Sequence, residues 1–372
     1  MSPDALIVGA GPAGLAAGAC LREAGLAPVL VDAAGRIGDS WRKHYDRLHL
    51  HTTRRLSGLP GLPIPRRFGR WVARDDVVRY LERYATHHGL EVRLGVETRR
   101  VDRRDGGWVV RTTAGDLATP RVVVATGYNR LPHLPDWPGR DGYTGDLIHA
   151  SDYRTPRPYR GRDVLVVGTG NSGAEIAADL AEQGAARVRI AVRTPPTIFP
   201  RDALGVPSQA IGIALAQLPP RVVDVLVRPL QRVMVGDLSR HGMPTSKHAY
   251  SQFLRDDVVP ILDVGLVDQL KAGRVEVVPA VEGFDGPEIL LAGGERIRAD
   301  AVIAATGYRR GLEPLVGHLG VLRPNGRPVP HGPDTHPAAP GLHFLGYTNP
   351  LGGNLRQLGI DARRIARAIA RG

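Results

Sequence analysis

The chain has 372 residues, 42% of them hydrophobic and 23% charged, a composition that suits a globular protein of two domains and excludes wholesale disorder. The formal net charge is +12, but the basic residues are spread along the chain without a dense run among aromatic residues, so we expect anionic cofactors and no nucleic-acid partner. The single cysteine, Cys20, excludes an intrachain disulfide, a cysteine-based zinc site and a redox-active cysteine pair.

The first predicted unit is a strand, a helix and a second strand. ALIVG, from Ala5, is a short apolar run that ends in glycine, which is typical of a buried parallel strand. Residues 13–24 have the composition of a helix, Gly25 marks its predicted end, and Pro28–Asp32 form the next predicted strand. Cys20 falls within this helix, where we expect a small buried packing residue.

A glycine-rich loop of the pattern GxGxxG joins the first strand to the helix. The first glycine permits a tight turn, the second lets the backbone approach a pyrophosphate, and the third lets helix and strand pack closely. The helix N-terminus offers N–H groups to phosphates, and the acid that closes the second strand can bind ribose hydroxyls. A glycine-rich turn without a ligand is the alternative. The residues expected to bind a dinucleotide here are Gly9, Gly11, Pro12, Ala13, Gly14 and Asp32.

A second unit of the same kind lies at 163–193. The strand after its helix is followed by Arg193 instead of an acid, and an arginine can clamp a 2′-phosphate but cannot accept a hydrogen bond from a ribose hydroxyl. The first loop therefore suits FAD and the second suits NADPH. The alternative for Arg193 is a solvated surface arginine. The residues expected at the second site are Gly168, Gly170, Asn171, Ser172, Gly173 and Arg193.

Two further segments resemble each other and mark where the chain changes domain. RVVVATGY (121–128) and AVIAATGY (301–308) each read as a buried strand that ends in Ala-Thr-Gly-Tyr. The stretch 203–260 predicts a helical insertion, and the final segment reads as a strand, a glycine-rich loop and a helix. The cofactor-binding residues expected in the two turns are Ala125, Thr126, Gly127, Thr306 and Gly307.

We therefore expect an α/β protein with two Rossmann-like, FAD/NAD(P)-binding domains of the three-layer ββα type and a small helical insertion. Residues 1–153 are expected to begin the FAD-binding domain and 299–372 to complete it. Residues 154–298 are expected to form the NADPH-binding domain, with the insertion at about 203–260. The first strand leaves no room for a signal peptide, and the apolar stretch 206–218 is too short to span a bilayer, so we expect a cytoplasmic protein without integral membrane contact.

Two dinucleotide folds would serve a disulfide reductase, an NADPH oxidase or a monooxygenase, and the lack of a cysteine pair argues against the first. The segment YTGDLIHASDY resembles the flavin-containing monooxygenase fingerprint FxGxxxHxxxF/Y: Gly145, His149 and Tyr153 match, and Tyr143 replaces the usual Phe. The chain has Tyr153-Arg154 where the related Baeyer–Villiger fingerprint has Trp-Pro, which argues against ketone-to-ester oxidation. For His149 a structural role and a direct chemical role are both open.

The resemblance sharpens toward YUCCA-type monooxygenases and related bacterial enzymes, and it covers nearly the whole chain. SWRKHYDRLHLHTTR (40–54) is similar to a YUCCA segment, and VLVVGTGNSGAEIAADL (164–180) is similar to its NADPH loop. The chain is thus identified as a member of the class B flavin-containing monooxygenase family.

This resemblance implies FAD and NADPH as cofactors and places His51 near the isoalloxazine ring, with an ordinary core or surface histidine as the alternative. The LGGNLRQLG loop is expected to lay backbone N–H groups near the pyrimidine edge of the flavin, where they would stabilise negative charge. An ordinary helix start is the alternative. The candidate catalytic residues are His51 and Asn354, and further cofactor-binding candidates are Trp41, Arg42, His149, Gly352 and Gly353.

The resemblance also implies an activity. It predicts an NADPH-dependent monooxygenase that forms a flavin hydroperoxide and inserts one atom of dioxygen into a small organic substrate, without a metal. N- or S-oxygenation and YUCCA-like oxidative decarboxylation of an aryl 2-oxo acid are both open. The alternatives are an NADPH oxidase or reductase that inserts no oxygen and a non-catalytic flavoprotein. A homodimer is one expected assembly.

Overall fold

The chain folds into two compact units and passes between them near the two Ala-Thr-Gly-Tyr segments. The computed structural model describes residues 2–371 except 105, 204, 216, 245 and 247–259. Unit 1 comprises Met1–Lys43, Arg47–Leu131 and Tyr308–Gly372, and unit 2 comprises His44–Asp46 and Pro132–Gly307.

The unit boundaries at 131/132 and 307/308 differ from the domain boundaries expected at 153/154 and 298/299. Two strands account for the difference. β9 (Asp146–His149) pairs in parallel with β20 (Ala301–Ala304), which in turn pairs with β10 (Asp163–Val167). Hydrogen bonds therefore assign both β9 and β20 to the sheet of unit 2.

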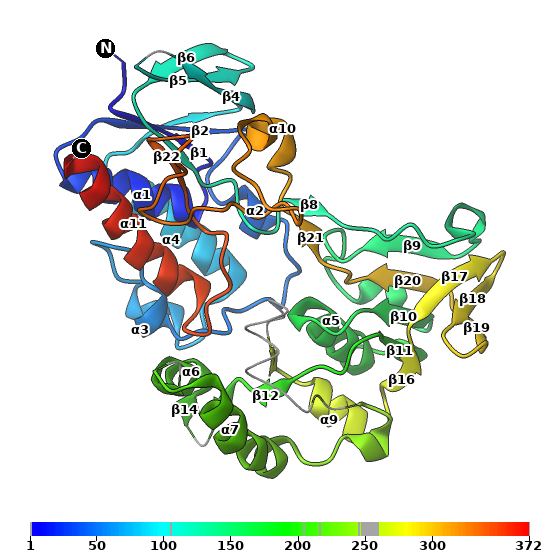
Figure 1. Ribbon diagram of the computed structural model, residues 1–372. Coiled ribbons are helices and arrows are strands. Elements are labelled where there is room, and N and C mark those ends of the chain that lie inside the picture. The colour runs from blue at the N-terminus through cyan, green and yellow to red at the C-terminus, as the bar shows by residue number, and fades with distance from the viewer. Residues whose placement is uncertain are drawn as a thin grey trace. The chain divides into compact units, whose positions relative to one another are not determined.

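Unit 1 is built on a parallel sheet of five strands in the order β22-β7-β1-β2-β3. Figure 1 labels β1, β2 and β22 of this sheet. These strands are β1 (Ala5–Val8), β2 (Pro28–Asp32), β3 (Glu91–Leu94), β7 (Val122–Val124) and β22 (Leu342–Phe344). One face packs against α1 (Pro12–Glu23), α4 (Arg74–His87) and α11 (Asn354–Arg371). The other face packs against an antiparallel meander of β4 (Thr98–Arg104), β5 (Gly107–Thr112) and β6 (Gly115–Thr119).

The side chains of β1 show why this strand reads as a continuous apolar run. Ala5 and Ile7 pack with the helices, whereas Leu6 and Val8 point to the opposite face and pack with residues of the meander such as Trp108. A strand alternates its side chains between two faces, and here both faces are covered. In α1, the predicted burial of Cys20 is confirmed, and that burial raises the pKa of its thiol to about 11.

Unit 2 repeats this plan with a parallel sheet in the order β16-β11-β10-β20-β9. Its further strands are β11 (Arg187–Val192) and β16 (Glu276–Pro279), and the antiparallel meander is formed by β17 (Val281–Asp285), β18 (Glu288–Leu291) and β19 (Arg296–Arg298). Helix α5 (Asn171–Glu182) follows β10, as α1 follows β1, and α9 (Leu266–Lys271) lies beside α5. The predicted fold class, two Rossmann-like units of three layers, is confirmed.

The segment predicted as a helical insertion is helical in its middle and begins with a short hairpin. A parallel pair, β12 (Ile198–Pro200) and β15 (Ile261–Asp263), stands at its two ends. Between them lie β13 (Asp202–Ala203), β14 (Val206–Pro207), α6 (Ser208–Leu215), α7 (Pro220–Val235) and the 3-10 turn η4 (Ser239–His241). Part of the predicted insertion, residues 247–259, lies outside the described residues.

The remaining described elements are short. In unit 1 they are α2 (Asp39–Arg42), α3 (Arg54–Ser57), α10 (Glu313–Val316), η1 (Arg66–Phe68) and η5 (Gly317–Leu319), and in unit 2 they are η2 (Arg140–Gly142) and η3 (Arg157–Tyr159). The two-residue strands β8 (Leu131–Pro132) and β21 (Tyr308–Arg309) lie where the chain changes unit. Within the described ranges, no helix combines the length and apolar character that crossing a bilayer requires.

Close backbone contact sets how each central helix meets its strand. A Cβ built on Gly14 would lie 1.8 Å from the carbonyl oxygen of Gly9, and a Cβ on Gly173 would lie 2.1 Å from that of Gly168. By contrast, a Cβ on Gly170 would meet no atom within 4 Å. The third glycine of each loop is therefore a packing requirement of the fold.

We predict that Gly173→Ala destabilises unit 2 because the added methyl must displace the Gly168 carbonyl. Overpacking of this kind costs about 1–3 kcal/mol, which corresponds to a fall of several degrees in Tm. The matched control Gly170→Ala, which has space for a Cβ and an ordinary φ of −82°, should keep the wild-type Tm. Thermal unfolding without added nucleotide is the measurement, and equal Tm values for the two variants would contradict the packing argument.

Candidate functional site

In unit 1, the glycine-rich loop forms a backbone cradle at the start of α1. Gly9 has a φ of +109°, and a Cβ on Gly11 would meet no atom within 4 Å, so the second glycine of the loop borders open space. Pro12 occupies the first turn of the helix. The backbone N–H groups of a first turn have no partner within the helix, so proline's lack of an N–H costs no hydrogen bond there. The neighbouring N–H groups of α1 supply the partial positive charge that phosphates favour.

Asp32 braces this loop from the end of β2. One carboxylate oxygen accepts the N–H of Ala10 at 2.6 Å, and the other accepts the N–H of Ala34 at 2.8 Å. Each carboxylate oxygen has two acceptor positions, so these amides leave capacity for ribose hydroxyls. The predicted Asp32 therefore stands next to the predicted glycines and also holds their backbone in place.

The first Ala-Thr-Gly-Tyr segment lies directly against this loop. The N–H of Ala125 donates to the carbonyl of Val8 at 2.8 Å, and a Cβ on Gly9 would lie 2.5 Å from the Ala125 oxygen. The backbone N–H and the hydroxyl of Thr126 both bond to the hydroxyl of Tyr347, at 3.1 and 2.8 Å. Burial raises the pKa of Tyr347 to about 12, so this phenol stays protonated. Sequence reasoning missed Tyr347, whose only signal is its place just after the final strand.

Unit 2 repeats the same contact. The N–H of Ala305 donates to the carbonyl of Val167 at 2.8 Å, and a Cβ on Gly168 would lie 2.5 Å from the Ala305 oxygen. The hydroxyl of Thr306 donates to the carbonyl of His133. Arg193 directly follows β11, as Asp32 ends β2, and its side chain is exposed. The two loops are therefore alike in backbone and opposite in charge at this one position.

Asn171, at the start of α5, uses its side chain inside the protein. Its Oδ1 accepts the N–H of Leu262 at 2.8 Å, and its Nδ2 donates to the carbonyl of Pro260 at 3.3 Å. The side chain that sequence reasoning assigned to the cofactor thus ties β15 to the glycine-rich loop. Ser172, the next residue, is half-buried in the first turn of α5.

The aromatic residues of the fingerprint act as anchors within unit 2. The hydroxyl of Tyr143 donates to the carbonyl of Ala299 at 2.7 Å, and a Cβ on Gly145 would lie 2.5 Å from that hydroxyl oxygen. The hydroxyl of Tyr153 donates to the buried carboxylate of Asp179 in α5 at 2.7 Å. The spacing of aromatic, glycine and aromatic residues is therefore explained by contacts to the loop before β20 and to α5.

His149 is also held on both ring nitrogens. Its Nδ1 accepts the N–H of Ser151 at 3.0 Å, so in the neutral ring the proton is on Nε2, which donates to the carbonyl of Gly307 at 3.0 Å. The side chain is buried, and that burial lowers its pKa, which favours the neutral form. His149 thereby fixes the second Ala-Thr-Gly-Tyr turn to the end of β9.

The other candidates for a flavin site lie on separate elements of unit 1. Arg42, in α2, forms an ion pair with Glu82 of α4, and its Nε is buried without a hydrogen-bond partner among the described residues. Trp41 is partly buried against the helix-side core. His51 is half-buried in the loop before α3, and Asn354 is the exposed first residue of α11. Gly352 and Gly353 precede it, and Gly353 has a φ of +92°.

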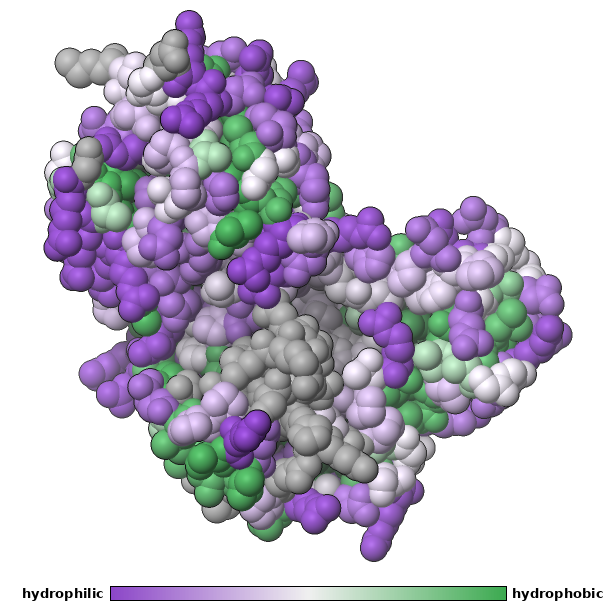
Figure 2. All heavy atoms as spheres, in the orientation of Figure 1, coloured by the Kyte–Doolittle hydropathy of each residue, from purple (hydrophilic) through white to green (hydrophobic). Residues whose placement is uncertain are grey.

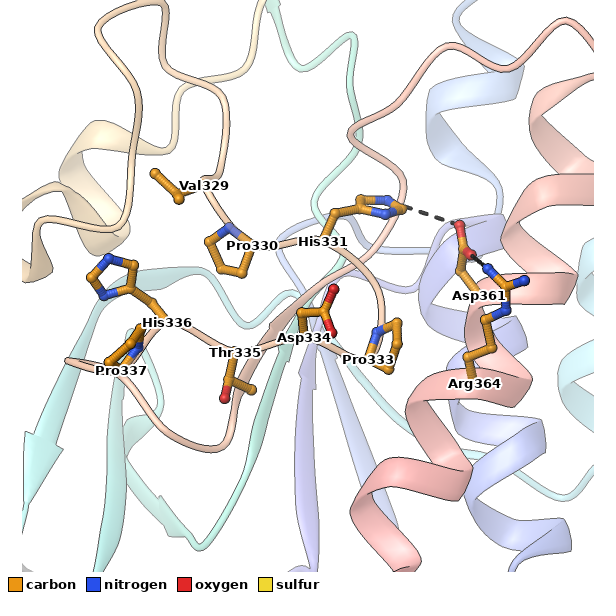
Figure 3. A pocket seen from close by; sticks show the side chains of 10 residues that line it. All are labelled: Val329, Pro330, His331, Pro333, Asp334, Thr335, His336, Pro337, Asp361 and Arg364. Carbon is orange, nitrogen blue, oxygen red and sulfur yellow. Dashed lines mark ion pairs between the residues drawn. The ribbon is translucent and has the colours of Figure 1, made fainter.

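A cavity of about 550 Å³ lies elsewhere in unit 1, and none of the predicted site residues lines it. Its polar walls include the buried carboxylate of Asp361, whose two oxygens accept from Nε2 of Gln357 at 3.0 Å. His331 and Arg364 face the same carboxylate at 3.9 and 3.7 Å (Figure 3). These contacts tie the loop before β22 to α11.

Within the part of the chain that is described, no group of three acidic, histidine or cysteine side chains is placed to hold a metal ion.

The residues present fit dinucleotide cofactors. Each unit offers a glycine that borders open space at the start of its central helix, and α2 offers a buried nitrogen with hydrogen-bonding capacity to spare. No cysteine pair is available for disulfide chemistry, because Cys20 is the only cysteine and is buried.

Comparison with known proteins places this architecture in a family. Residues 6–202 match the model of the pyridine nucleotide-disulphide oxidoreductase family. The rice protein named indole-3-pyruvate monooxygenase YUCCA1 (Oryza sativa subsp. japonica) is 35% identical over 354 residues, which cover 93% of this chain and 87% of the rice protein. The probable indole-3-pyruvate monooxygenase YUCCA9 of Arabidopsis thaliana is 33% identical over 98% of this chain and 88% of its own length.

A solved structure supports the same family. A mutant flavin monooxygenase from Stenotrophomonas maltophilia superposes with a TM-score of 0.78 at 26% identity, covering 100% of this chain and 98% of the bacterial one. Because the sequence matches and the fold extend over nearly the whole chain, this protein belongs to the FAD- and NADPH-dependent flavin monooxygenases, and it is a homologue of the YUCCA-type enzymes.

Proposed function

We propose that FAD binds at the glycine-rich loop of unit 1 and NADPH at that of unit 2. The observation that carries this assignment is the contrast between Asp32 and Arg193 at equivalent positions. A carboxylate suits ribose hydroxyls, whereas a guanidinium suits the 2′-phosphate that only NADPH carries. Gly11 and Gly170, which border open space, are proposed to approach the two pyrophosphates.

When bound, FAD supplies the redox chemistry that NADPH and dioxygen require. The residues of the chain are proposed to hold and polarise it. The Nε of Arg42 is buried and can donate a hydrogen bond. The turn of Gly352, Gly353 and Asn354 is proposed to lie at the pyrimidine edge of the flavin, where the start of α11 favours negative charge. Within this turn, the N–H of Gly353 donates to the carbonyl of Pro350 at 3.1 Å. His51 is proposed to lie at the flavin ring.

For the substrate, we propose an aryl 2-oxo acid that undergoes oxidative decarboxylation. Support comes from the full-length similarity to proteins named for indole-3-pyruvate. The step balances: the 2-oxo acid, O₂, NADPH and a proton give the acid shortened by one carbon, CO₂, water and NADP⁺. Oxygenation of a nucleophilic nitrogen or sulfur is the second candidate.

We also propose that the enzyme lies in the cytoplasm.

His149 is proposed to be a positioning residue. Both ring nitrogens are engaged, and one of them holds the carbonyl of Gly307 in the turn that follows β20. Its role would thus be to fix that turn beside the nucleotide loop of unit 2, with no proton transfer to substrate.

Incubation of the FAD-loaded enzyme with NADPH, O₂ and indole-3-pyruvate should give indole-3-acetate and CO₂ in a ratio near one per NADPH. The flavin-free protein is the control and should form no product. Release of one H₂O₂ per NADPH with no product from the 2-oxo acid, an amine or a thioether would instead assign an NADPH oxidase.

Arg193→Ala should raise KM for NADPH by about 10- to 100-fold and leave KM for NADH nearly unchanged. Loss of a charge-assisted hydrogen bond is worth about 1.5–3 kcal/mol, which corresponds to this range. Arg187→Ala, at the opposite end of β11, is the matched control and should alter neither constant. Equal effects of Arg193→Ala on both coenzymes would remove Arg193 from the 2′-phosphate role.

His149→Gln should lower stability at pH 7.5 by about 1–2 kcal/mol because it disturbs two hydrogen bonds. The folded protein lowers the pKa of His149, so its stabilising contribution is full above pH 6.5 and is lost as the pH falls through the folded pKa. The gap in free energy of unfolding between wild type and variant should therefore shrink from pH 7.5 to pH 5. A gap that stays constant with pH, or a kcat loss with unchanged stability, would argue against the positioning role.

A further inference from the structure

The segment between α2 and α3 belongs to unit 2 for only three residues. His44–Asp46 group with unit 2, although Lys43 before them and Arg47 after them belong to unit 1. The same segment carries Arg42 and His51, two of the side chains that we propose for the flavin site. A short piece of unit 2 is therefore inserted between two candidate flavin contacts.

Tyr45 holds this insertion among the aromatic residues of unit 2. It is 3% exposed, and its ring meets that of Tyr153 edge to face, with the centroids 6.2 Å apart and the planes at 61°. Tyr153 also stacks on Tyr159, with the centroids 5.9 Å apart. Aromatic pairs in these two arrangements stabilise a fold beyond the area that they bury. Tyr45 is thus a buried member of an aromatic cluster.

The backbone beside Tyr45 is held as well. The N–H of Asp46 donates to the carbonyl of Arg154 at 2.9 Å. The guanidinium of Arg154 in turn donates to the carbonyls of Ser151 and Tyr153, at 2.6 and 3.0 Å. Ring packing and a main-chain hydrogen bond therefore both fasten the insertion to the end of the fingerprint segment.

Tyr153 connects this anchor to the glycine-rich loop of unit 2. Its hydroxyl donates to the buried carboxylate of Asp179 in α5 at 2.7 Å. Helix α5 begins at Asn171, within the loop that we propose for NADPH. Packed side chains, hydrogen bonds and rigid helices are the elements through which two sites can be coupled. An unbroken series of such contacts leads from the start of α5 to Tyr45.

Both ends of the segment are fastened in unit 1. Before the insertion, Arg42 of α2 forms an ion pair with Glu82 of α4. After it, the N–H of Leu50 donates to the carbonyl of Val72 at 2.8 Å. Because the ends are held in unit 1 and the middle is held in unit 2, the segment transmits a displacement of one to the other.

The ring of Tyr45 serves the interior of the protein and not its surface. In unit 2, the exposed large hydrophobic side chains that are described lie between residues 206 and 233. Figure 2 shows hydrophobic surface gathered over α6 and α7, which belong to this stretch. Tyr45 is not part of that surface, so its apolar ring acts through the residues packed against it.

We propose that Tyr45 is a positioning residue that ties the segment 42–51 to the nucleotide-binding helix α5. It acts through Arg42 and His51, whose positions at the flavin it sets when NADPH is bound, and it takes no part in the chemistry itself. The inference rests on the proposed cofactor sites, because it assigns the segment to the flavin and α5 to NADPH.

The first test is stopped-flow reduction of the FAD-loaded enzyme by NADPH, followed by the loss of the flavin's visible absorbance. Tyr45→Leu keeps an apolar side chain but removes the ring. It should lower the limiting rate by about 10- to 100-fold, because a misplacement of about 1 Å can cost about 100-fold in rate. The NADPH concentration at half the limiting rate should stay close to wild type, since the glycine-rich loop is untouched. Tyr45→Phe, which retains the ring, should retain the rate.

Tyr159→Leu is the matched control for lost packing. It removes another ring neighbour of Tyr153 but lies outside the segment 42–51. It should lower Tm as Tyr45→Leu does and leave the limiting rate of reduction unchanged. A wild-type rate in Tyr45→Leu, or equal losses of rate in Tyr45→Leu and Tyr159→Leu, would overturn the proposal.

The second test needs no turnover and, in the wild type, no variant. Backbone amide exchange, measured by mass spectrometry, should slow in residues 39–51 when NADP⁺ is added to the oxidised, FAD-loaded enzyme. In Tyr45→Leu, NADP⁺ should still slow exchange at the start of α5 but no longer in residues 39–51.

The exchange measurement separates two kinds of failure. Protection of α5 by NADP⁺ without protection of residues 39–51 in the wild type would overturn this inference alone. Protection of residues 39–51 that survives in Tyr45→Leu would do the same. No protection of α5 in the wild type would overturn the proposed nucleotide site together with the inference.

Discussion

Each glycine-rich loop of this protein depends on backbone contacts that leave no room for a side chain on its first and third glycines. The carbonyl of Gly9 fills the space of a Cβ on Gly14, and the carbonyl of Ala125 fills the space of a Cβ on Gly9. The same pair of contacts recurs at Gly168 and Gly173 in unit 2. Because neighbouring backbone fills the space on both sides of the loop, the N–H groups of the following helix point to the edge of the sheet, where we propose that a phosphate binds.

The monooxygenase fingerprint has a structural meaning in this chain. Its aromatic residues and its histidine bond to Ala299, Gly307 and Asp179, so the fingerprint segment is fastened to the loops before and after β20 and to α5. Such a motif identifies the family through the way it holds unit 2 together. The oxygen chemistry belongs to the bound flavin, and the motif need not supply a reacting group.

Much of the fold could be predicted because its signals are local. The strand of Ala5, the helix that contains Cys20 and the acid Asp32 lie within one short segment, and hydrophobic period and glycine spacing suffice to order them. The unit boundaries could not be placed. The segment of β20 reads only as a buried strand and that of β9 only as part of a fingerprint, and it is their hydrogen bonds that assign both strands to unit 2. The role of Tyr347 could not be predicted either, because its hydrogen-bond partner Thr126 is 221 positions away in the sequence.

By itself, the sequence determined the two glycine-rich loops, the contrast between Asp32 and Arg193, and the family, because these depend on residue type and spacing along one stretch of chain. Tertiary structure alone decided what the side chains of Asn171 and His149 do and that residues 44–46 belong to unit 2. A side chain's role depends on what lies beside it in space. Sequence spacing fixes neighbours along a helix or strand, but long-range packing fixes neighbours between elements.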